Sequence, residues 1–194
     1  NVVAIGRAPK SNIKRRSAAK VGDIVAVTGK LGTSSKGLVD IMFGDLDTVA
    51  AKHHRVAQAR IAEGVWLGGR EEVHAMMDVS DGVASDIKHI MELSKVGAEI
   101  ELSTIPTDYD IRYATTGGED YELLLTVDAE NFDRVTEELK EATGTTLTAP
   151  MQSLQQRSRR DIRSRELMSV FLNATSSSHP SGIRPSKNGK RILD

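Results

Sequence analysis

The chain has 194 residues, with 26 Lys and Arg, 27 Asp and Glu, 39% apolar residues and no cysteine. This length suits one large domain or one domain with a tail, and the composition excludes a wholly disordered chain, a disulfide framework and a thiolate metal site. No apolar run approaches the roughly 20 residues that a membrane helix needs. We therefore expect a cytoplasmic protein that does not bind a membrane. Because the net charge is −1 and aromatic residues make up only 4%, we also expect no binding to nucleic acid.

Strand and helix patterns alternate along the first half of the chain. Short apolar runs predict strands at residues 2–5, 24–28 and 73–79. Between the last two strands, a helix begins at 37–42, and helix-forming residues predict a second helix over 48–63. This order indicates a protein with layers of both kinds of element.

The second half continues the alternation. The patterns predict a helix that begins after Gly82 and ends at Gly97, then a strand at 98–102 and a loop at 103–116. They then predict a strand at 121–127, a helix that Asp128 caps and Gly144 ends, and a strand at 145–149. Because strands and helices alternate without repeats, we expect an α/β architecture.

The charge is divided unevenly along the chain. Residues 151–194 hold nine Lys and Arg but three Asp and Glu, against 17 and 24 in residues 1–150, so the formal charges are +6 and −7. Hydrophobic periodicity is also lost after Pro150. We therefore expect a domain at 1–150 and a basic, Ser- and Arg-rich tail at 151–194, to which we assign no function.

Two aspartates flank a predicted strand-to-helix turn in Asp78-Val79-Ser80-Asp81-Gly82. If Asp78 and Asp81 point to the same side, a hard cation such as Mg²⁺ would relieve their repulsion. The following helix N-terminus favours phosphate, and Ser80 adds a hydroxyl donor. The alternative is that Ser80 or Asp81 is only a helix cap, although a cap does not explain Asp78.

A second candidate motif is Gly117-Gly118-Glu119-Asp120-Tyr121-Glu122-Leu123. Paired glycines permit close backbone approach and place Glu119 and Asp120 at the start of a strand. The alternative is a glycine turn with these two acids solvated. In the basic run at 14–16, Arg16 could neutralise a triphosphate, although such runs are usually only solvated. The five histidines have no metal-ligand spacing, so we expect surface or packing roles for them.

Taken together, four segments resemble the C-terminal half of the bacterial thiamine-monophosphate kinase family. This family belongs to the superfamily of aminoimidazole ribonucleotide synthetase and selenophosphate synthetase. The resemblance covers roughly residues 2–150, and several motifs in one order are more specific than any one motif. The segments are 16–29, 77–87, 94–98 and 117–124.

The resemblance implies an α/β (α+β) fold, with helices packed on a mixed sheet, and a homodimer in the complete protein. It also implies that ATP and Mg²⁺ are used to phosphorylate thiamine monophosphate to thiamine diphosphate. Asp78 and Asp81 would hold Mg²⁺, Ser80 and Arg16 would contact ATP, and Glu119 would face the thiamine phosphate. Transfer between two anionic phosphates needs charge screening and alignment more than a protein nucleophile.

This chain also departs from the family. It lacks the N-terminal half that carries aspartate-rich metal loops, so we expect it to be part of a longer protein. Segment 105–117 is shorter than usual, His54–Arg60 lacks both prolines of an H-x-x-P-x-P-R pattern, and the tail does not match. Two alternatives remain: another ATP-dependent enzyme such as aminoimidazole ribonucleotide synthetase, or a catalytically silent domain that packs on a partner. We expect this chain alone to fold but not to catalyse.

Overall fold

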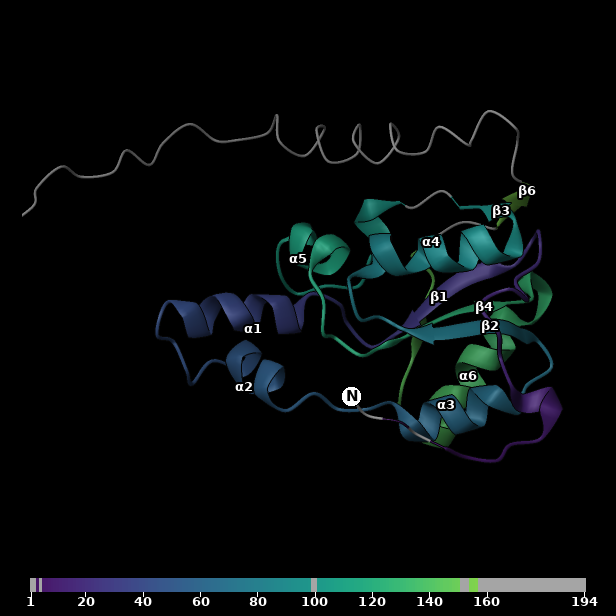
Figure 1. Ribbon diagram of the computed structural model, residues 1–194, viewed down its shortest axis with the longest axis horizontal. Helices are drawn as coiled ribbons and strands as arrows, with labels where there is room; N and C mark the ends of the chain where they lie inside the picture. Colours follow the sequence, from purple (N-terminus) through teal and green to yellow (C-terminus); the bar gives the residue numbers. More distant parts are fainter. Residues whose placement is uncertain (1–2, 4, 99–100, 151–153, 157–194) are drawn as a thin grey trace, which may run out of the picture. The chain divides into compact units, whose positions relative to one another are not determined.

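A four-stranded sheet is the centre of the structure, a computed structural model that describes residues 3, 5–98, 101–150 and 154–156 (Figure 1). The strand order is β2-β4-β1-β5. Val27 of β1 lies opposite Leu124 of β4, and Asp78 of β2 lies opposite Leu123. The strands span Ile24–Thr28 (β1), Val73–Asp78 (β2), Leu123–Val127 (β4) and Leu147–Thr148 (β5).

The predicted class, helices packed on a sheet, is confirmed, but each strand pair in the described residues is antiparallel, so the sheet is not mixed. Strand β4 lies between β1 and β2 and pairs antiparallel with both. Strands β1 and β2, which a helical segment connects, therefore run parallel to each other but are not neighbours in the sheet. Alternation of strands and helices along the sequence suggests that successive strands are parallel neighbours. It does not reveal that a later strand, here β4, inserts between them.

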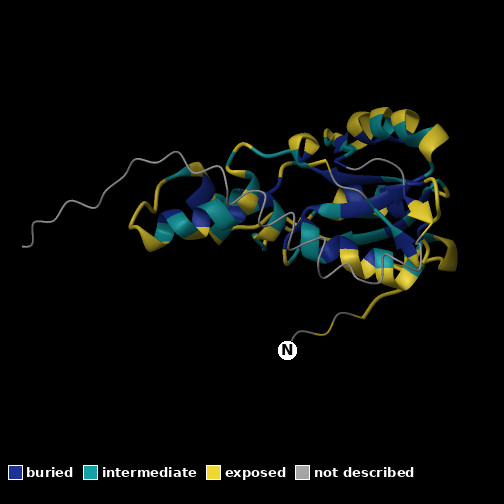
Figure 2. Cartoon of the chain, turned by 90° about the horizontal axis from the view of Figure 1, so that it is seen from above, coloured by how far each residue is buried: buried dark blue, intermediate teal, exposed yellow. Residues whose placement is uncertain are grey.

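Helices cover both faces of the sheet, and alternate strand residues pack against them. Val27 and Leu124 pack with α4 (Val83–Ser94) and α5 (Ile111–Thr116), whereas Ala26 and Leu125 pack with α3 and α6 on the opposite face. Helix α3 spans Ile61–Gly68 and α6 spans Phe132–Thr143. The most buried residues lie in the sheet and on the helix faces turned toward it (Figure 2). None of the helices within the described ranges is long and apolar enough to cross a membrane.

Helices α1 (Thr33–Met42) and α2 (Val49–Arg55) pack closely on one another. A Cβ at Gly37 would lie 2.0 Å from the carbonyl oxygen of Ala50, so only glycine allows this approach. Thr48 caps α2 by accepting a hydrogen bond from the backbone N–H of Ala51 at 3.0 Å. The predicted helix at 48–63 is therefore wrong, because the chain leaves the helix after Arg55 and begins α3 at Ile61.

Other predicted elements also change. The predicted loop at 103–116 contains the short helix α5, which Asp110 caps through the N–H of Arg112. Of the predicted strand at 98–102, residues 99 and 100 lie outside the described residues, and the strand observed is β3 at Val96–Gly97. Of the predicted strand at 2–5, residues 2 and 4 lie outside them, and Val3 and Ile5 are exposed. In the part of the chain that the structure describes, 3-10 helices span Lys10–Asn12, Leu102–Thr104 and Ala129–Asn131.

The described residues beyond Pro150 belong to the packed structure. The side chain of Leu154 is 1% exposed and lies in the core with α4. Its backbone N–H donates to Asp23 at 2.7 Å, and its carbonyl accepts from Gly22 at 2.8 Å. Strand β6 (Gln155–Gln156) then pairs with β3. The rest of the predicted tail, residues 157–194, lies outside the described residues.

Candidate functional site

The two motifs found in the sequence form one hydrogen-bonded unit at the end of the β2–β4 pair. The N–H of Val79 donates to the carbonyl of Glu122 at 2.7 Å, and Tyr121 donates back to Val79 at 2.9 Å. The N–H of Glu119 donates to Ser80 at 2.9 Å. The loop at 78–82 is therefore held against the loop at 117–122 by the main chain itself.

Glycines allow the two loops to come this close. A Cβ at Gly118 would lie 2.3 Å from the carbonyl oxygen of Ser80. Gly82 has φ +94°, and its Cβ would lie 2.8 Å from the carbonyl oxygen of Gly117. Other side chains would push the loops apart, which explains why both motifs contain glycine.

Backbone conformation decides which acid of the second motif faces inward. Glu119 and Tyr121 have φ +66° and +53°, unusual values for residues other than glycine, and the side chain between them is buried. Asp120 is 1% exposed and accepts hydrogen bonds from the N–H groups of Gly32 at 2.6 Å and Ser34 at 3.0 Å, at the start of α1. Burial raises the pKa of Asp120, while these two hydrogen bonds act in the opposite direction. Asp120 is therefore a buried structural residue, and the alternative that both Glu119 and Asp120 are solvated is wrong.

A second buried acid holds the first motif. Asp86 accepts from the N–H groups of Ser80 at 2.8 Å and Asp81 at 3.0 Å, and it is 1% exposed. Burial raises the pKa of Asp86, and the nearby Asp81 and Asp78 act in the same direction. The cap of α4 is Gly82, with no side-chain cap bond. The alternative that Ser80 or Asp81 serves only as a helix cap is therefore wrong.

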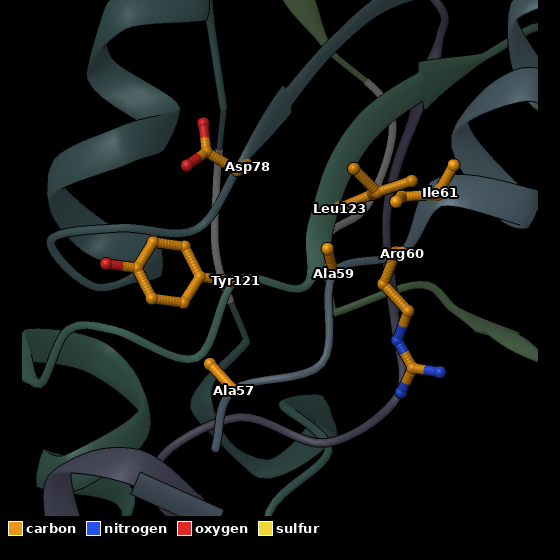
Figure 3. Close-up of a pocket in the computed structure, with 7 residues that line it drawn as sticks. All are labelled: Ala57, Ala59, Arg60, Ile61, Asp78, Tyr121 and Leu123. Atoms are coloured by element: carbon orange, nitrogen blue, oxygen red, sulfur yellow. The ribbon is translucent and has the colours of Figure 1, made fainter. Parts of the chain in front are cut away.

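The predicted site residues are divided between two cavities. Asp78 and Tyr121 line the first cavity, into which the Arg60 guanidinium does not point (Figure 3). Ser80, Asp81 and Glu119 line the second together. Thus the structure brings three of the five predicted residues to one cavity and Asp78 to its neighbour. The other lining residues are Ala57, Ala59, Ile61 and Leu123 in the first, and Ser35, Leu38, His54, Thr116 and Gly118 in the second.

Arg16 is not brought to either cavity. Its carbonyl oxygen accepts a hydrogen bond from Ser94 Oγ at 2.8 Å, at the C-terminal end of α4. Asp81 precedes the opposite end of this 12-residue helix, whose length is about 18 Å.

His54 is a site residue that the sequence reasoning did not find. Its Nδ1 lies 2.8 Å from Ser34 Oγ and 3.7 Å from Glu119 Oε2, and its side chain is 17% exposed. It therefore connects the start of α1 to the cavity. The only signal in the sequence is its place at the start of the segment that resembles H-x-x-P-x-P-R.

The sequence reasoning also did not find a network of ion pairs between Arg60, Glu63 and Glu122. Arg60 Nε and Nη2 donate to Glu122 Oε2 and Oε1, both at 2.7 Å, and Nη1 lies 3.2 Å from Glu63 Oε1. The hydrogen bonds to Glu122 raise the pKa of Arg60 above its ordinary value. Thr28 donates to Glu122 at 2.6 Å, and Thr145 donates to Glu63 at 2.6 Å. Residues from four parts of the chain meet here beside the first cavity.

Asp78 and Asp81 line different cavities, and the carboxylate of each suits a magnesium ion that other groups also bind. Within the residues that the structure describes, neither carboxylate forms an ion pair, and no three His, Cys, Asp or Glu side chains form a metal cluster. In proteins Mg²⁺ commonly takes one or two carboxylates and completes its shell with phosphate oxygens and water. Each carboxylate therefore fits as one of the ligands of such an ion.

A comparison of the sequence with protein-family models gives a match. Residues 20–148 match the model described as AIR synthase related protein, C-terminal domain. The chain belongs to this family. Both site loops lie inside the matched range.

Relatives within the AIR synthase related family carry a more specific name. Thiamine-monophosphate kinase of Haemophilus influenzae is 35% identical over 154 residues, which are 72% of this chain and 46% of the relative. The crystal structure of thiamine-monophosphate kinase from Stenotrophomonas maltophilia has a TM-score of 0.67 and 27% identity, covering 76% of this chain and 52% of that chain. The complex of AaThiL with AMPPCP and TMP has a TM-score of 0.62 and 26% identity, covering 73% and 47%. The chain thus spans about half the length of the relatives it matches.

Proposed function

We propose that the complete protein is an ATP-dependent kinase that converts thiamine monophosphate to thiamine diphosphate. The observation that carries this proposal is the union of the two motif loops, which places Ser80, Asp81 and Glu119 at one cavity in a chain related to thiamine-monophosphate kinases. The AaThiL complex with AMPPCP, an ATP analogue, and TMP supports the same pair of ligands. A homodimer and a cytoplasmic location remain predictions.

The roles of the residues follow from their chemistry. Asp78 and Asp81 would hold Mg²⁺, which when bound screens the charge of the two phosphate groups. Ser80 donates its hydroxyl to a nucleotide phosphate, and Glu119 faces the thiamine phosphate. Because Asp86 binds the N–H groups of Ser80 and Asp81, this loop is already ordered before ligands arrive. Arg16 remains a predicted nucleotide contact, which its place at the far end of α4 does not support.

The reaction needs little covalent chemistry from the protein. An oxygen of the acceptor phosphate attacks the γ-phosphorus of ATP in line with the leaving ADP, and alignment and charge screening supply most of the catalysis. The cavity lined by Asp81 and Glu119 provides acids but, among its described lining residues, no lysine or arginine. We therefore expect the rest of the complete protein to supply cationic or metal-binding groups, and the 194-residue chain alone not to catalyse.

The test compares products and variants. The complete protein should form thiamine diphosphate from thiamine monophosphate and Mg-ATP, and should not form aminoimidazole ribonucleotide from its precursor.

A variant tests the role of Glu119. Glu119→Gln should raise KM for thiamine monophosphate more than it weakens Mg-ATP binding. The control is Glu130→Gln, in a 3-10 helix away from the cavities. Thiamine diphosphate formed by the purified 194-residue chain above a no-enzyme control would contradict the expected inactivity. Equal KM values for wild type and Glu119→Gln would remove Glu119 from the substrate site.

A further inference from the structure

The pair between Arg60 and Glu122 joins parts of the chain that are 62 residues apart. Two nitrogens of the guanidinium meet two carboxylate oxygens, both at 2.7 Å, and the side chains are 25% and 5% exposed. Such a fork-shaped pair fixes the direction of both side chains as well as their separation. Lysine cannot form it, because an ammonium group has no planar fork.

Neighbouring groups fix the orientation of Glu122. The N–H of Leu123 donates to Thr28 Oγ1 at 2.8 Å, so the hydroxyl proton of Thr28 is free to donate to Glu122 Oε2 at 2.6 Å. A Cβ at Gly29 would lie 2.3 Å from Glu122 Oε1, so the backbone there leaves space only for the carboxylate. Glu122 thus accepts hydrogen bonds on both of its oxygens and is confined on one side.

The main chain of Glu122 connects this pair to the candidate site. Its carbonyl accepts from Val79, one residue before Ser80, and Tyr121 donates back to Val79. The loop at 117–122 contains two residues at positive φ, a costly conformation that surrounding contacts must maintain. Arg60 contacts this loop from outside both motifs, at the end of a non-helical segment that contains no proline.

We propose that Arg60 is a positioning residue for the site. Its pair with Glu122 holds the loop at 117–122 against the loop at 78–82 and thereby sets the shape of the cavity lined by Ser80, Asp81 and Glu119. The effect on thiamine monophosphate rests on the proposed function, whereas the effect on loop geometry does not. Arg60 itself lines only the first cavity.

The test uses the full chain with Arg60→Lys, which keeps the charge and removes the fork. Amide hydrogen exchange should become about tenfold faster or more at Val79, Glu119 and Tyr121, whose N–H groups join the loops, and should be unchanged in β1 and β4. Arg134→Lys is the matched control, because Arg134, on α6, also pairs with two glutamates, Glu72 and Glu138. It should leave exchange at the loops unchanged.

Two results would overturn the proposal: unchanged exchange at the three amides, or equal acceleration throughout the sheet, which would indicate a general loss of stability. If Arg60→Lys does not fold, Glu122→Gln replaces it and the same comparison decides. In the complete protein, Arg60→Lys should weaken thiamine monophosphate binding about tenfold by calorimetry. Unchanged affinity with faster loop exchange would contradict the positioning role, whereas failure of the wild type to bind or phosphorylate this substrate would contradict only the proposed function.

Discussion

The acids of the two site loops fall into two groups by burial. Asp120 and Glu122 are 1% and 4% exposed and are bound by the protein's own N–H, hydroxyl and guanidinium donors. Asp81 and Glu119 line the cavity, where ligands can reach them. A buried carboxylate without partners would destabilise the fold, so the buried acids need their donors in place. The exposed acids have no such structural requirement and are available for ligand binding.

Replacing Asp81 should separate metal binding from stability. In Asp81→Asn, Mg-nucleotide binding by the complete protein should weaken about tenfold or more, because an amide is a poorer ligand for Mg²⁺ than a carboxylate. The melting temperature should stay the same, because Asp81 is exposed and Gly82, not Asp81, caps α4. Calorimetric titration and thermal unfolding measure the two effects, with Asp45→Asn as an exposed control. Unchanged affinity would remove Asp81 from the metal site.

The stability of the fold should depend on pH through Asp120. Burial raises the pKa of Asp120 in the folded protein above its ordinary value of 3.8, so folding favours the protonated form. The contribution of Asp120 to stability is therefore full below the unfolded pKa and decreases as pH rises through the folded pKa. The difference in unfolding free energy between wild type and Asp120→Asn should fall from about pH 4 upward in urea titrations. Parallel curves for the two proteins would show that the pKa is not raised.

The segment between α2 and α3 shows how an element boundary is set by distant contacts. The sequence predicts one helix over residues 48–63, yet the chain is not helical between Arg55 and Ile61. Thr145 and Glu122 come from other parts of the chain, and their contacts with Glu63 and Arg60 favour this break. Tertiary contacts of this kind override local propensity.

Prolines should be accepted in this segment. The N–H groups of Ala57 and Ala59 donate no hydrogen bond in the structure, so Ala57→Pro with Ala59→Pro removes no bond and restricts the unfolded chain. We expect a melting temperature higher by about 2–4 °C. Ala142→Pro, in the last turn of α6, should instead destabilise by about 3 kcal/mol. A lower melting temperature for the double variant would show that the backbone at 57–59 is not compatible with proline.

At the scale of the whole molecule, helices cover both faces of one antiparallel sheet, and Leu154 is the last residue of the described part of the chain that lies in the core. This residue lies with Ile87 and Ile90 of α4 in the core cluster on one face. Its hydrogen bonds to Gly22 and Asp23 connect it to the turn before β1. The folded unit therefore includes residues beyond the boundary that composition suggests.

Truncation should locate the end of the folded unit. A chain ending at Gln156 should unfold at a higher temperature than one ending at Pro150, because removal of a buried leucine alone costs about 2–5 kcal/mol. Leu154→Ala in the full chain should reproduce most of this loss. Equal melting temperatures for the two truncated chains would place Leu154 outside the core in solution.

The sequence by itself determined those features that neighbouring residues control. Apolar runs located β1, and they located β2 and β4 with one or two extra residues at one end of each. The spacing of Val83, Ile87 and Ile90 located α4, and Gly144, at φ +79°, ends α6 as predicted. The resemblance of ordered motifs indicated the family. These signals are local because helix periodicity, caps and turns depend on residues only a few positions apart.

Only the tertiary structure decided how distant segments meet. It inserted β4 between β1 and β2, placed Asp78 and Asp81 at different cavities, and turned Asp120 inward between Glu119 and Tyr121. The pair of Arg60 and Glu122 also depends on contact across many intervening residues. Such choices follow from packing both sheet faces and supplying donors to buried carboxylates, and no single stretch of sequence contains both partners.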